Sequence, residues 1–338
     1  MELEKILITL AEASGASGSE NDAAETALSM LRKYCTDAEI KNGNVIGYVG
    51  GRDENKKTVL LDAHLDQIGF VVTHIEENGF VKFSNLGGID RRLLPAQQVV
   101  IRGKQNIRGV IGSVPPHLSN GESSVPTYDN LAIDTGMTAE ELSKYVSPGD
   151  AITFDNKCRR LLGSRITGQS FDDRCGIAAI LYALDLLRNS EPDCNLAVLF
   201  STQEELGERG AAIGGFEINP DIAIAVDVSF GYVTGENELK CGKLGKGPMI
   251  GISPSLSREI SDKLTDTAEK NGIPYQIEVM NGLTSTNADR FSVCRGGAKA
   301  CTVSIPLRYM HTPVEVIDIR DVEFSGRLLA AYIKEAQK

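Results

Sequence analysis

Short apolar runs that end in an acid or a histidine constrain the fold of this chain most strongly. The run at 58–64, TVLLDAH, is apolar enough to form a strand buried on both faces of a parallel sheet. Runs of the same character occur at 196–202 and 222–229, and helical patterns at 174–189 and 257–272 alternate with these strands. Such alternation is typical of an α/β fold.

The α/β alternation is interrupted between residues 70 and 162. The segments there are short, rich in β-forming residues and punctuated by Gly, Asn and Pro, with one helix candidate at 138–146. We therefore predict a β-rich domain at 70–162, inserted into a discontinuous catalytic domain made of 1–69 and 163–338.

Composition excludes several classes of partner. There are 35 Lys and Arg against 46 Asp and Glu, a net charge of −11, and there is no long basic run, so nucleic acid is not expected to bind. The chain lacks a cationic leader and any apolar stretch near the roughly 20 residues of a membrane helix, which predicts a cytoplasmic protein without a membrane partner. The seven cysteines are scattered without C-x-x-C spacing and are expected to be reduced thiols, not zinc ligands.

Two adjacent acids, Glu204 and Glu205, follow the apolar strand at 196–202. In open α/β sheets, ligands bind at the carboxyl ends of the strands, where loops bring reactive groups together over a rigid sheet. A pair of acids at this edge suggests a metal ligand beside a proton carrier.

Histidines stand at two further strand ends. His64 and Asp66 are two residues apart, so their side chains leave the same face of the strand, and the acid can orient the imidazole. His311 follows the last strand and precedes Pro313, so a loop presents it. Taken alone, His64 is more often a buried core histidine, Asp66 a turn acid and His311 a surface histidine.

Three more acids occupy comparable places. Asp172 and Asp173 precede a helix, where carboxylates are also favoured as caps, and Asp227 ends an apolar strand, where a lone charge would be costly. Because one acid or histidine ends each of several separate strands, coincidence is the weaker explanation.

Together these groups form a mixed nitrogen and oxygen donor set that suits zinc, cobalt or manganese and is too rich in nitrogen for a calcium site. Four clustered carboxylates would repel one another strongly unless cations neutralise them. The four are Asp172, Glu204, Glu205 and Asp227. Two divalent ions fit this set better than one.

The motifs, taken in order, resemble the glutamyl and deblocking aminopeptidase family of dinuclear metallopeptidases, the tetrahedral TET-type enzymes, some of which carry the label endoglucanase M. The similarity is carried by SGASGSE, AHLDQIGF, GVIGSVPPHL, SPGDAITF, FDDRCG, STQEELGERGA, AVDVS and RYMHTPVEVID. The resemblance implies a mixed-sheet core with helices on both faces and an inserted small β-barrel-like domain that forms dimers. Dimers of such enzymes commonly assemble into dodecamers.

The resemblance also implies roles for individual residues. The implied metal ligands are His64, Asp172, Glu205, Asp227 and His311. Asp172 would bridge the two ions, with His64 and Asp227 completing one site. Asp172 is chosen over Asp173 because the family pattern allows Asn at the second position.

The other ion would be completed by Glu205 and His311, with Glu204 as the general base. Asp66 would orient His64, and the peptide bond after the bridging acid would be cis. The implied reaction is removal of the amino-terminal residue from short peptides by water activated between two ions, zinc or cobalt first and manganese as a further candidate.

Two departures from the family pattern and three rival functions stay open. Gln67 stands where many relatives have Glu, and Asn287 lies in a segment that replaces Gly-Gly-Thr-Asp-Ala, so glutamyl specificity is not transferred. A carboxypeptidase or a deacylase would need a cation to bind the carboxylate of its substrate. Arg308, near His311, could supply that cation, so this alternative stays open. A glycosidase is disfavoured by the absence of Trp. A non-catalytic scaffold is the remaining alternative.

Overall fold

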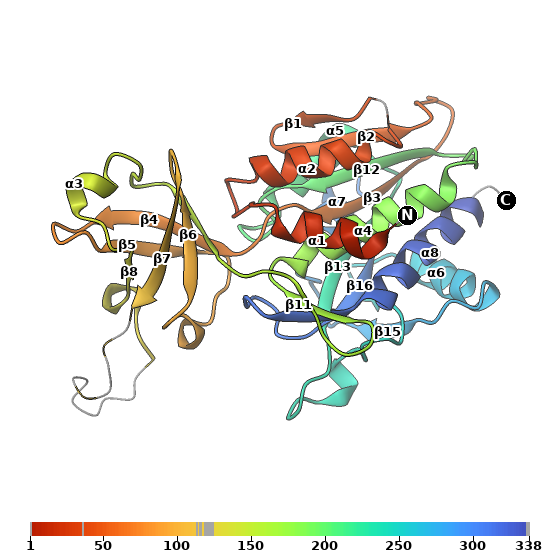
Figure 1. The fold of residues 1–338 in the computed structure, drawn as a ribbon. Helices are drawn as coiled ribbons and strands as arrows, with labels where there is room; N and C mark the ends of the chain where they lie inside the picture. The colour runs from red at the N-terminus through yellow and green to blue at the C-terminus, as the bar shows by residue number, and fades with distance from the viewer. Residues whose placement is uncertain (1, 36, 113, 115–116, 118–124, 336–338) are drawn as a thin grey trace.

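The computed structural model describes residues 2–35, 37–112, 114, 117 and 125–335 (Figure 1). The motif GVIGSVPPHL therefore lies partly outside the described residues. In the predicted catalytic domain, residues 1, 36 and 336–338 also lie outside the described part of the chain.

Within this described part, eight strands form one mixed sheet in the order β1-β2-β12-β3-β13-β16-β14-β15. These strands are β1 (Glu39–Lys41), β2 (Asn44–Val49), β3 (Thr58–His64), β12 (Asn195–Ser201), β13 (Ile222–Phe230), β14 (Met249–Ile252), β15 (Gln276–Val279) and β16 (Lys299–Leu307). The central strands β12, β3, β13 and β16 are parallel, whereas β2 and β14 run antiparallel to their central neighbours. The carboxyl ends of the central strands thus meet at one edge.

Helices cover both faces of the sheet, as Figure 1 shows. Their bounds are α1 (Leu3–Glu12), α2 (Asn21–Leu31), α4 (Phe171–Leu187), α5 (Arg209–Ile218), α6 (Arg258–Lys270), α7 (Ala288–Val293) and α8 (Ile319–Glu335). Alternate strand residues pack on opposite sides, because successive side chains of a strand point to opposite faces. Leu61 packs with α4 and α8, and its neighbour Leu60 packs with α5 and α7. The predicted α/β fold with helices on both faces is confirmed.

A closed barrel interrupts the sheet domain after β3. Its strands are β4 (Gly69–Ile75), β5 (Val81–Leu86), β6 (Gln98–Arg102), β7 (Asn106–Gly112), β8 (Ala132–Asp134) and β9 (Ala151–Phe154), with the short helix α3 (Ala139–Leu142) between the last two. Phe70 lies at the centre of the barrel core, edge-on to Phe83 and Phe154 at centroid distances of 5.1 and 5.3 Å. The inserted barrel expected from the resemblance is confirmed.

The chain returns from the barrel through a small second sheet of β10 (Arg159–Arg160), β11 (Arg165–Gly168) and β17 (Glu315–Asp318). This sheet places β17 next to the start of α4. The barrel strands end at Phe154, before this small sheet begins. The predicted division into two domains at 70–162 stays a prediction.

Local details refine the expected helices. Helix α2 begins at Asn21, and its N-cap is Glu20. Asp172 and Asp173 have non-helical backbone angles, so regular α4 begins at Arg174. Three-residue 3₁₀ turns lie at Arg91–Leu93, Tyr128–Asn130 and Glu238–Lys240.

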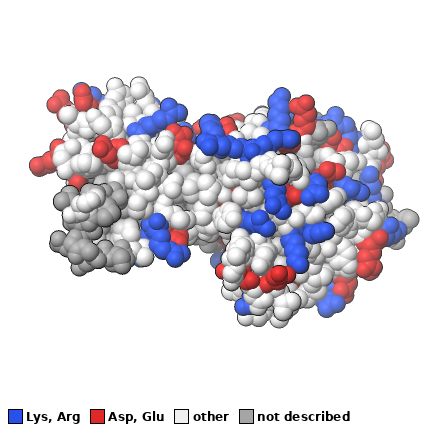
Figure 2. Space-filling model, turned by 60° about the horizontal axis from the view of Figure 1, so that its bottom comes forward, with Lys and Arg blue, Asp and Glu red and all other residues white. Residues whose placement is uncertain are grey.

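On the face drawn in Figure 2, Lys and Arg side chains are interspersed with Asp and Glu over both lobes. The expectation that nucleic acid does not bind stays a prediction. Among the described helices, none combines the length and the apolar character needed to span a membrane.

The aromatic centre of the barrel leads to a stability prediction. Phe70 is fully buried, whereas Phe80, in the turn between β4 and β5, is 38% exposed. Phe70→Ala should lower the free energy of unfolding by about 3–5 kcal/mol, because it leaves a cavity in a packed core. Phe80→Ala should stay within about 0.5 kcal/mol. Urea unfolding measures both variants, and similar losses in the two would contradict the packing argument.

Candidate metal centre

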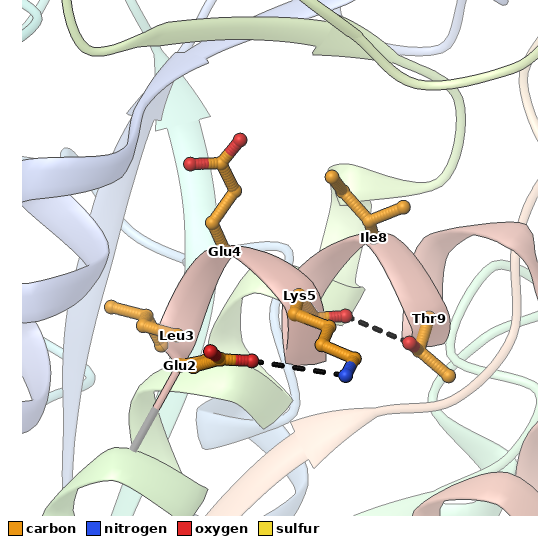
Figure 3. A pocket seen from close by; sticks show the side chains of 6 residues that line it. All are labelled: Glu2, Leu3, Glu4, Lys5, Ile8 and Thr9. Atoms are coloured by element: carbon orange, nitrogen blue, oxygen red, sulfur yellow. Dashed lines mark hydrogen bonds and ion pairs between the residues drawn. The ribbon is translucent and has the colours of Figure 1, made fainter.

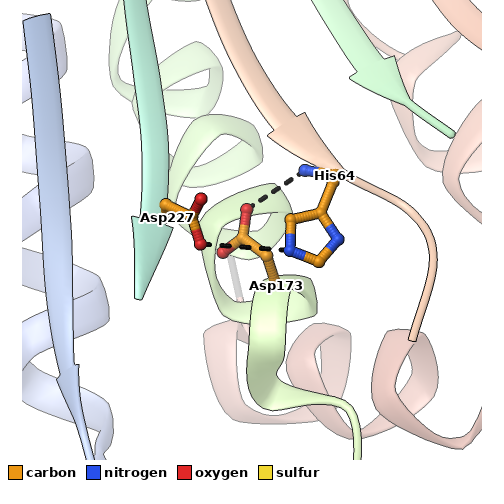
Figure 4. Close-up of side chains that lie close together, drawn as sticks. All are labelled: His64, Asp173 and Asp227. Carbon is orange, nitrogen blue, oxygen red and sulfur yellow. Dashed lines mark hydrogen bonds and ion pairs between the residues drawn. The ribbon is translucent and has the colours of Figure 1, made fainter. Parts of the chain in front are cut away.

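The acids and histidines found at strand ends meet at the carboxyl edge of the large sheet. His64 ends β3, Asp227 lies near the end of β13, and Asp173 lies in the turn into α4 (Figure 4). His311 comes from the loop after β16, and the acid pair from the loop after β12. Residues from opposite ends of the chain are thus brought to one place.

Asp172 lies between the two histidines. Its Oδ1 is 3.0 Å from Nε2 of His64, and its Oδ2 is 3.4 Å from Nε2 of His311. Each carboxylate oxygen therefore faces a different imidazole.

The acids and histidines form two compact donor groups, and Asp172 belongs to one of them. Asp172, Glu205 and His311 bring ligand atoms within 4.8 Å of one another, and so do His64, Asp173 and Asp227. Nε2 of His311 is 3.1 Å from Oε1 of Glu205, and Nε2 of His64 is 3.9 Å from Oδ1 of Asp227.

Asp173 differs from the other acids in how its oxygens are used. Its Oδ2 accepts the backbone N–H of His64 at 3.1 Å, and its Oδ1 accepts that of Gly176 at 3.0 Å. The second bond is a helix cap, which the sequence had left open for both aspartates. The peptide bond between Asp172 and Asp173 is cis.

Asp66 connects the histidine to the acid pair. Its Oδ1 accepts the backbone N–H of Glu204 at 2.9 Å, and its Oδ2 accepts that of Glu205 at 3.1 Å and the hydroxyl of Ser17 at 2.5 Å. Nδ1 of His64 lies 3.4 Å from Oδ1 of Asp66 and 3.0 Å from its backbone carbonyl. Asp66 therefore orients the loop that carries both glutamates as well as the imidazole.

Burial sets the electrostatics of this cluster. Burial raises the pKa of Glu204 to about 9 and that of Asp227 to about 8, and other carboxylates in the cluster add to both shifts. Burial opposes protonation of His311, yet hydrogen bonds to Asp172 and Glu205 raise its pKa to about 11. Each shift reduces the repulsion among buried acids.

These observations fit a site for divalent cations. When Nδ1 of His64 donates to the Asp66 carbonyl, the Nε2 lone pair faces an oxygen of Asp172 at 3.0 Å. Two acceptors at that distance require a proton or a cation between them. Imidazole nitrogens and carboxylate oxygens are the donors that zinc and its neighbours prefer.

Two buried or partly buried acids next to the donor groups were not singled out from the sequence. Glu315 on β17 is buried, and its Oε2 accepts the backbone N–H groups of Phe171 at 2.7 Å and Asp172 at 3.3 Å. Glu20 accepts the backbone N–H of Gln203 at 3.2 Å, next to the acid pair. Both lie inside quoted motifs, but only the fold shows what they contact.

The inserted barrel also reaches the donor groups. A Cβ added at Gly87 would lie 2.9 Å from Oε2 of Glu205, and one at Gly88 would lie 3.2 Å from Nδ1 of His311. Gly87 also has a φ of +80°, which glycine adopts without strain. The turn after β5 can therefore approach Glu205 and His311 closely, because Gly87 and Gly88 carry no side chains.

Asn287 and Gln67, the two departures from the family pattern, are both buried, and so is Asp62, a hydrogen-bond partner of Asn287. Nδ2 of Asn287 donates to Oδ2 of Asp62 and to Oγ of Ser201, each at 2.8 Å. The Oε1 of Gln67 has no hydrogen-bond partner within the described residues. Arg308, the cation considered above for a substrate carboxylate, donates from its Nε to the backbone carbonyl of Tyr232 at 2.6 Å.

The hollow drawn in Figure 3 lies along α1 and is lined by Glu2, Leu3, Glu4, Lys5, Ile8 and Thr9. Its dashed contacts are a Glu2–Lys5 ion pair at 3.8 Å and a bond from the Thr9 hydroxyl to the Lys5 carbonyl at 2.7 Å. None of these lining residues belongs to the donor groups at the sheet edge.

Comparison with known proteins agrees with the geometry. The sequence model of a family described as M42 glutamyl aminopeptidase matches residues 43–328. A lysyl aminopeptidase of Pyrococcus furiosus is 30% identical over 339 residues, which cover 98% of this chain and 96% of that protein.

Two solved structures show the same similarity. An aminopeptidase from the archaeon Desulfurococcus kamchatkensis matches with a TM-score of 0.93 at 34% identity, over 99% of this chain and 95% of that one. The Pyrococcus horikoshii TET1 peptidase, described as able to assemble into a tetrahedron or a large octahedral shell, matches with a TM-score of 0.87 at 32% identity, over 98% of each chain. The resemblance expected from the motifs is confirmed.

Removing divalent ions should destabilise the protein. A ligand that binds only the folded state stabilises it by about 4 kcal/mol at 1,000 times its Kd, and without cations the buried carboxylates repel one another. We expect chelation to lower the melting temperature and added zinc or cobalt to restore it. Asp172→Asn should shrink the difference between the two conditions. Equal melting of the wild type with and without chelator would contradict a cation site.

Proposed function

We propose that this chain, which belongs to the M42 glutamyl aminopeptidase family and is a peptide hydrolase, removes the amino-terminal residue from short peptides at a centre for two divalent ions. The observation that carries this proposal is the position of Asp172. One of its carboxylate oxygens faces His64 and the other faces His311. An acid so placed can serve two ions at once.

The donor groups divide naturally around this shared acid. His64 and Asp227 would hold one ion together with Asp172, and Glu205 and His311 would hold the other. Asp173 is left out because both its oxygens already accept backbone N–H groups. Zinc or cobalt suits the set best, with manganese as a further candidate.

When bound, the two ions would polarise the scissile carbonyl and acidify water. Glu204 would then accept a proton from the attacking water and deliver it to the departing amine nitrogen. No hydrogen bond to the Glu204 side chain is present among the described residues, whereas its backbone N–H is held by Asp66. The carboxylate is thus positioned through its backbone and keeps its oxygens available for protons.

Adjacent glutamates provide a matched test of these roles. Glu204→Gln should lower kcat by about 10² to 10⁴, the usual contribution of a general base, while both ions stay bound. Glu205→Gln should lower the metal content as well as the activity. Metal analysis and turnover of aminoacyl-p-nitroanilides measure both, and retained activity in Glu204→Gln would remove Glu204 from this role.

The polarity of attack can be tested with blocked substrates. An aminopeptidase should cleave free aminoacyl-p-nitroanilides with zinc or cobalt and should leave their N-acetylated forms intact. Faster cleavage of the blocked forms would instead support a deacylase or another amide hydrolase, and turnover of none of them would favour the non-catalytic alternative.

The proposal extends to assembly. A solved relative is described as a dodecamer, and another as a tetrahedron or octahedral shell. We expect dimers formed through the barrel and a dodecamer built from them. Light scattering should give a mass near twelve subunits, and a mass near one subunit would contradict assembly.

A further inference from the structure

A buried acid that the proposed chemistry leaves unused, Asp62, lies behind the donor groups. It is on β3, two residues before His64, so the two side chains leave the same face of the strand. In the neighbouring strand β13 its register partner is Ala225, which stands two residues before Asp227. Asp62 is therefore one strand repeat, roughly 7 Å, behind both His64 and Asp227.

Two polar side chains hold the carboxylate of Asp62. Its Oδ2 accepts a hydrogen bond from Nδ2 of Asn287 at 2.8 Å, and the same nitrogen donates to Oγ of Ser201 at 2.8 Å. The Ser201 side chain also forms a hydrogen bond with the carboxylate. Asn287 directly precedes α7 and Ser201 ends β12, so a helix and a neighbouring strand fix the position of this acid.

The charge of Asp62 lacks a compensating partner. The side chain is fully buried, and its Oδ1 has no hydrogen bond to any described residue. Oδ1 of Asn287, also buried, has none either within that part of the chain. No described Lys or Arg forms an ion pair with Asp62. A buried carboxylate with so few partners is costly, because burial removes the charge from water. Such an acid calls for a cation close by.

The cation that fits is the ion expected between His64 and Asp227. Both of these ligands are one strand repeat from Asp62, whereas Glu205 and His311 come from the loops that follow β12 and β16. Coulomb energy falls with distance, and salt screens buried charges only weakly. The charge of Asp62 therefore acts mainly on the nearer of the two ions.

We propose that Asp62 strengthens the binding of the ion held by His64 and Asp227, and thereby makes the two metal positions unequal in affinity. The inference rests on the proposed dinuclear centre and assigns the difference between its positions to one residue. In this role Asp62 does not ligate the ion but acts through its charge. That charge destabilises the metal-free protein and stabilises the loaded one, which separates the role from a purely structural one.

Asp62→Asn keeps the size of the side chain and removes its charge. We expect this variant to weaken the binding of one zinc or cobalt ion by roughly 10- to 100-fold, the usual range for residues just outside a metal's ligands. The other ion should keep its affinity. Competition with a chelator of known affinity measures both dissociation constants, and unchanged constants in Asp62→Asn would overturn the proposal.

The same substitution should raise the melting temperature of the metal-free protein, because it removes one of several buried carboxylates that repel one another. Circular dichroism of the chelated protein measures this change. A structural role predicts the reverse: a lower melting temperature in chelated Asp62→Asn, with ion affinities equal to those of the wild type. That result would also overturn the proposal.

An exchanged pair separates the charge of Asp62 from its shape. Combining Asp62→Asn with Asn287→Asp retains one acid, one amide and the same net charge at this place. The exchanged protein should recover the affinity that Asp62→Asn alone loses. Recovery supports a role for the charge, and an affinity as weak as that of the single variant contradicts it.

Asp321→Asn is the matched control. Asp321 is another fully buried acid, near the start of α8, and its oxygens accept the backbone N–H groups of Gly245 and Gly247. Because it lies outside the donor groups, its substitution should change neither ion affinity. A loss in Asp321→Asn equal to that in Asp62→Asn would overturn the assignment.

Metal binding and turnover together distinguish this inference from the proposed function. If the affinity depends on Asp62 as expected but no aminoacyl substrate is cleaved, the proposed function fails and the role of Asp62 stands. If the wild type removes amino-terminal residues while Asp62→Asn binds both ions normally, only the role of Asp62 fails. A wild type that binds fewer than two ions overturns both.

Discussion

The Asp172 carboxylate, placed between two imidazoles, is the constraint on which the rest of the structure depends. Its oxygens lie 3.0 and 3.4 Å from the histidine nitrogens, while its backbone N–H donates to Glu315. Three distant parts of the chain must therefore meet: the end of β3, the turn into α4, and the stretch that runs from the loop after β16 into strand β17. The parallel core makes this possible, because it directs the ends of its central strands to one edge.

A second layer of backbone contacts makes the centre rigid. Asp66 accepts both N–H groups of the Glu204–Glu205 loop, and Glu20 accepts the N–H of Gln203 just before it. The barrel adds the backbone of Gly87, whose missing side chain leaves room for Glu205. Side chains that must act at fixed positions are thus held by groups from both the sheet and the barrel.

The sheet face that bears the centre changes character along its strands. Ala223, Ala225 and Ala300 pack with α5 and α7 near the amino-terminal ends. Towards the carboxyl edge the same face carries Asp227, Ser304 and the carboxylate of Glu278. Small residues let the helices approach closely near the amino-terminal ends, and polar side chains occupy the edge where the donor groups lie.

The sequence by itself determined the central buried strands and the acid or histidine that follows several of them, because burial and alternation are encoded locally by residue type and period. It also indicated the barrel and, through its motifs, the family. Only the tertiary structure decided which groups meet. Asp173 caps α4 while its neighbour faces two histidines, and Asn287 bonds to Asp62 from 225 positions away. Glu315 lies inside a quoted motif, but nothing in that motif indicated its bonds to the backbone of Phe171 and Asp172. Periodicity specifies which face of a strand is buried, but the partners of a buried polar group depend on strand order and register, which are set only when the chain packs.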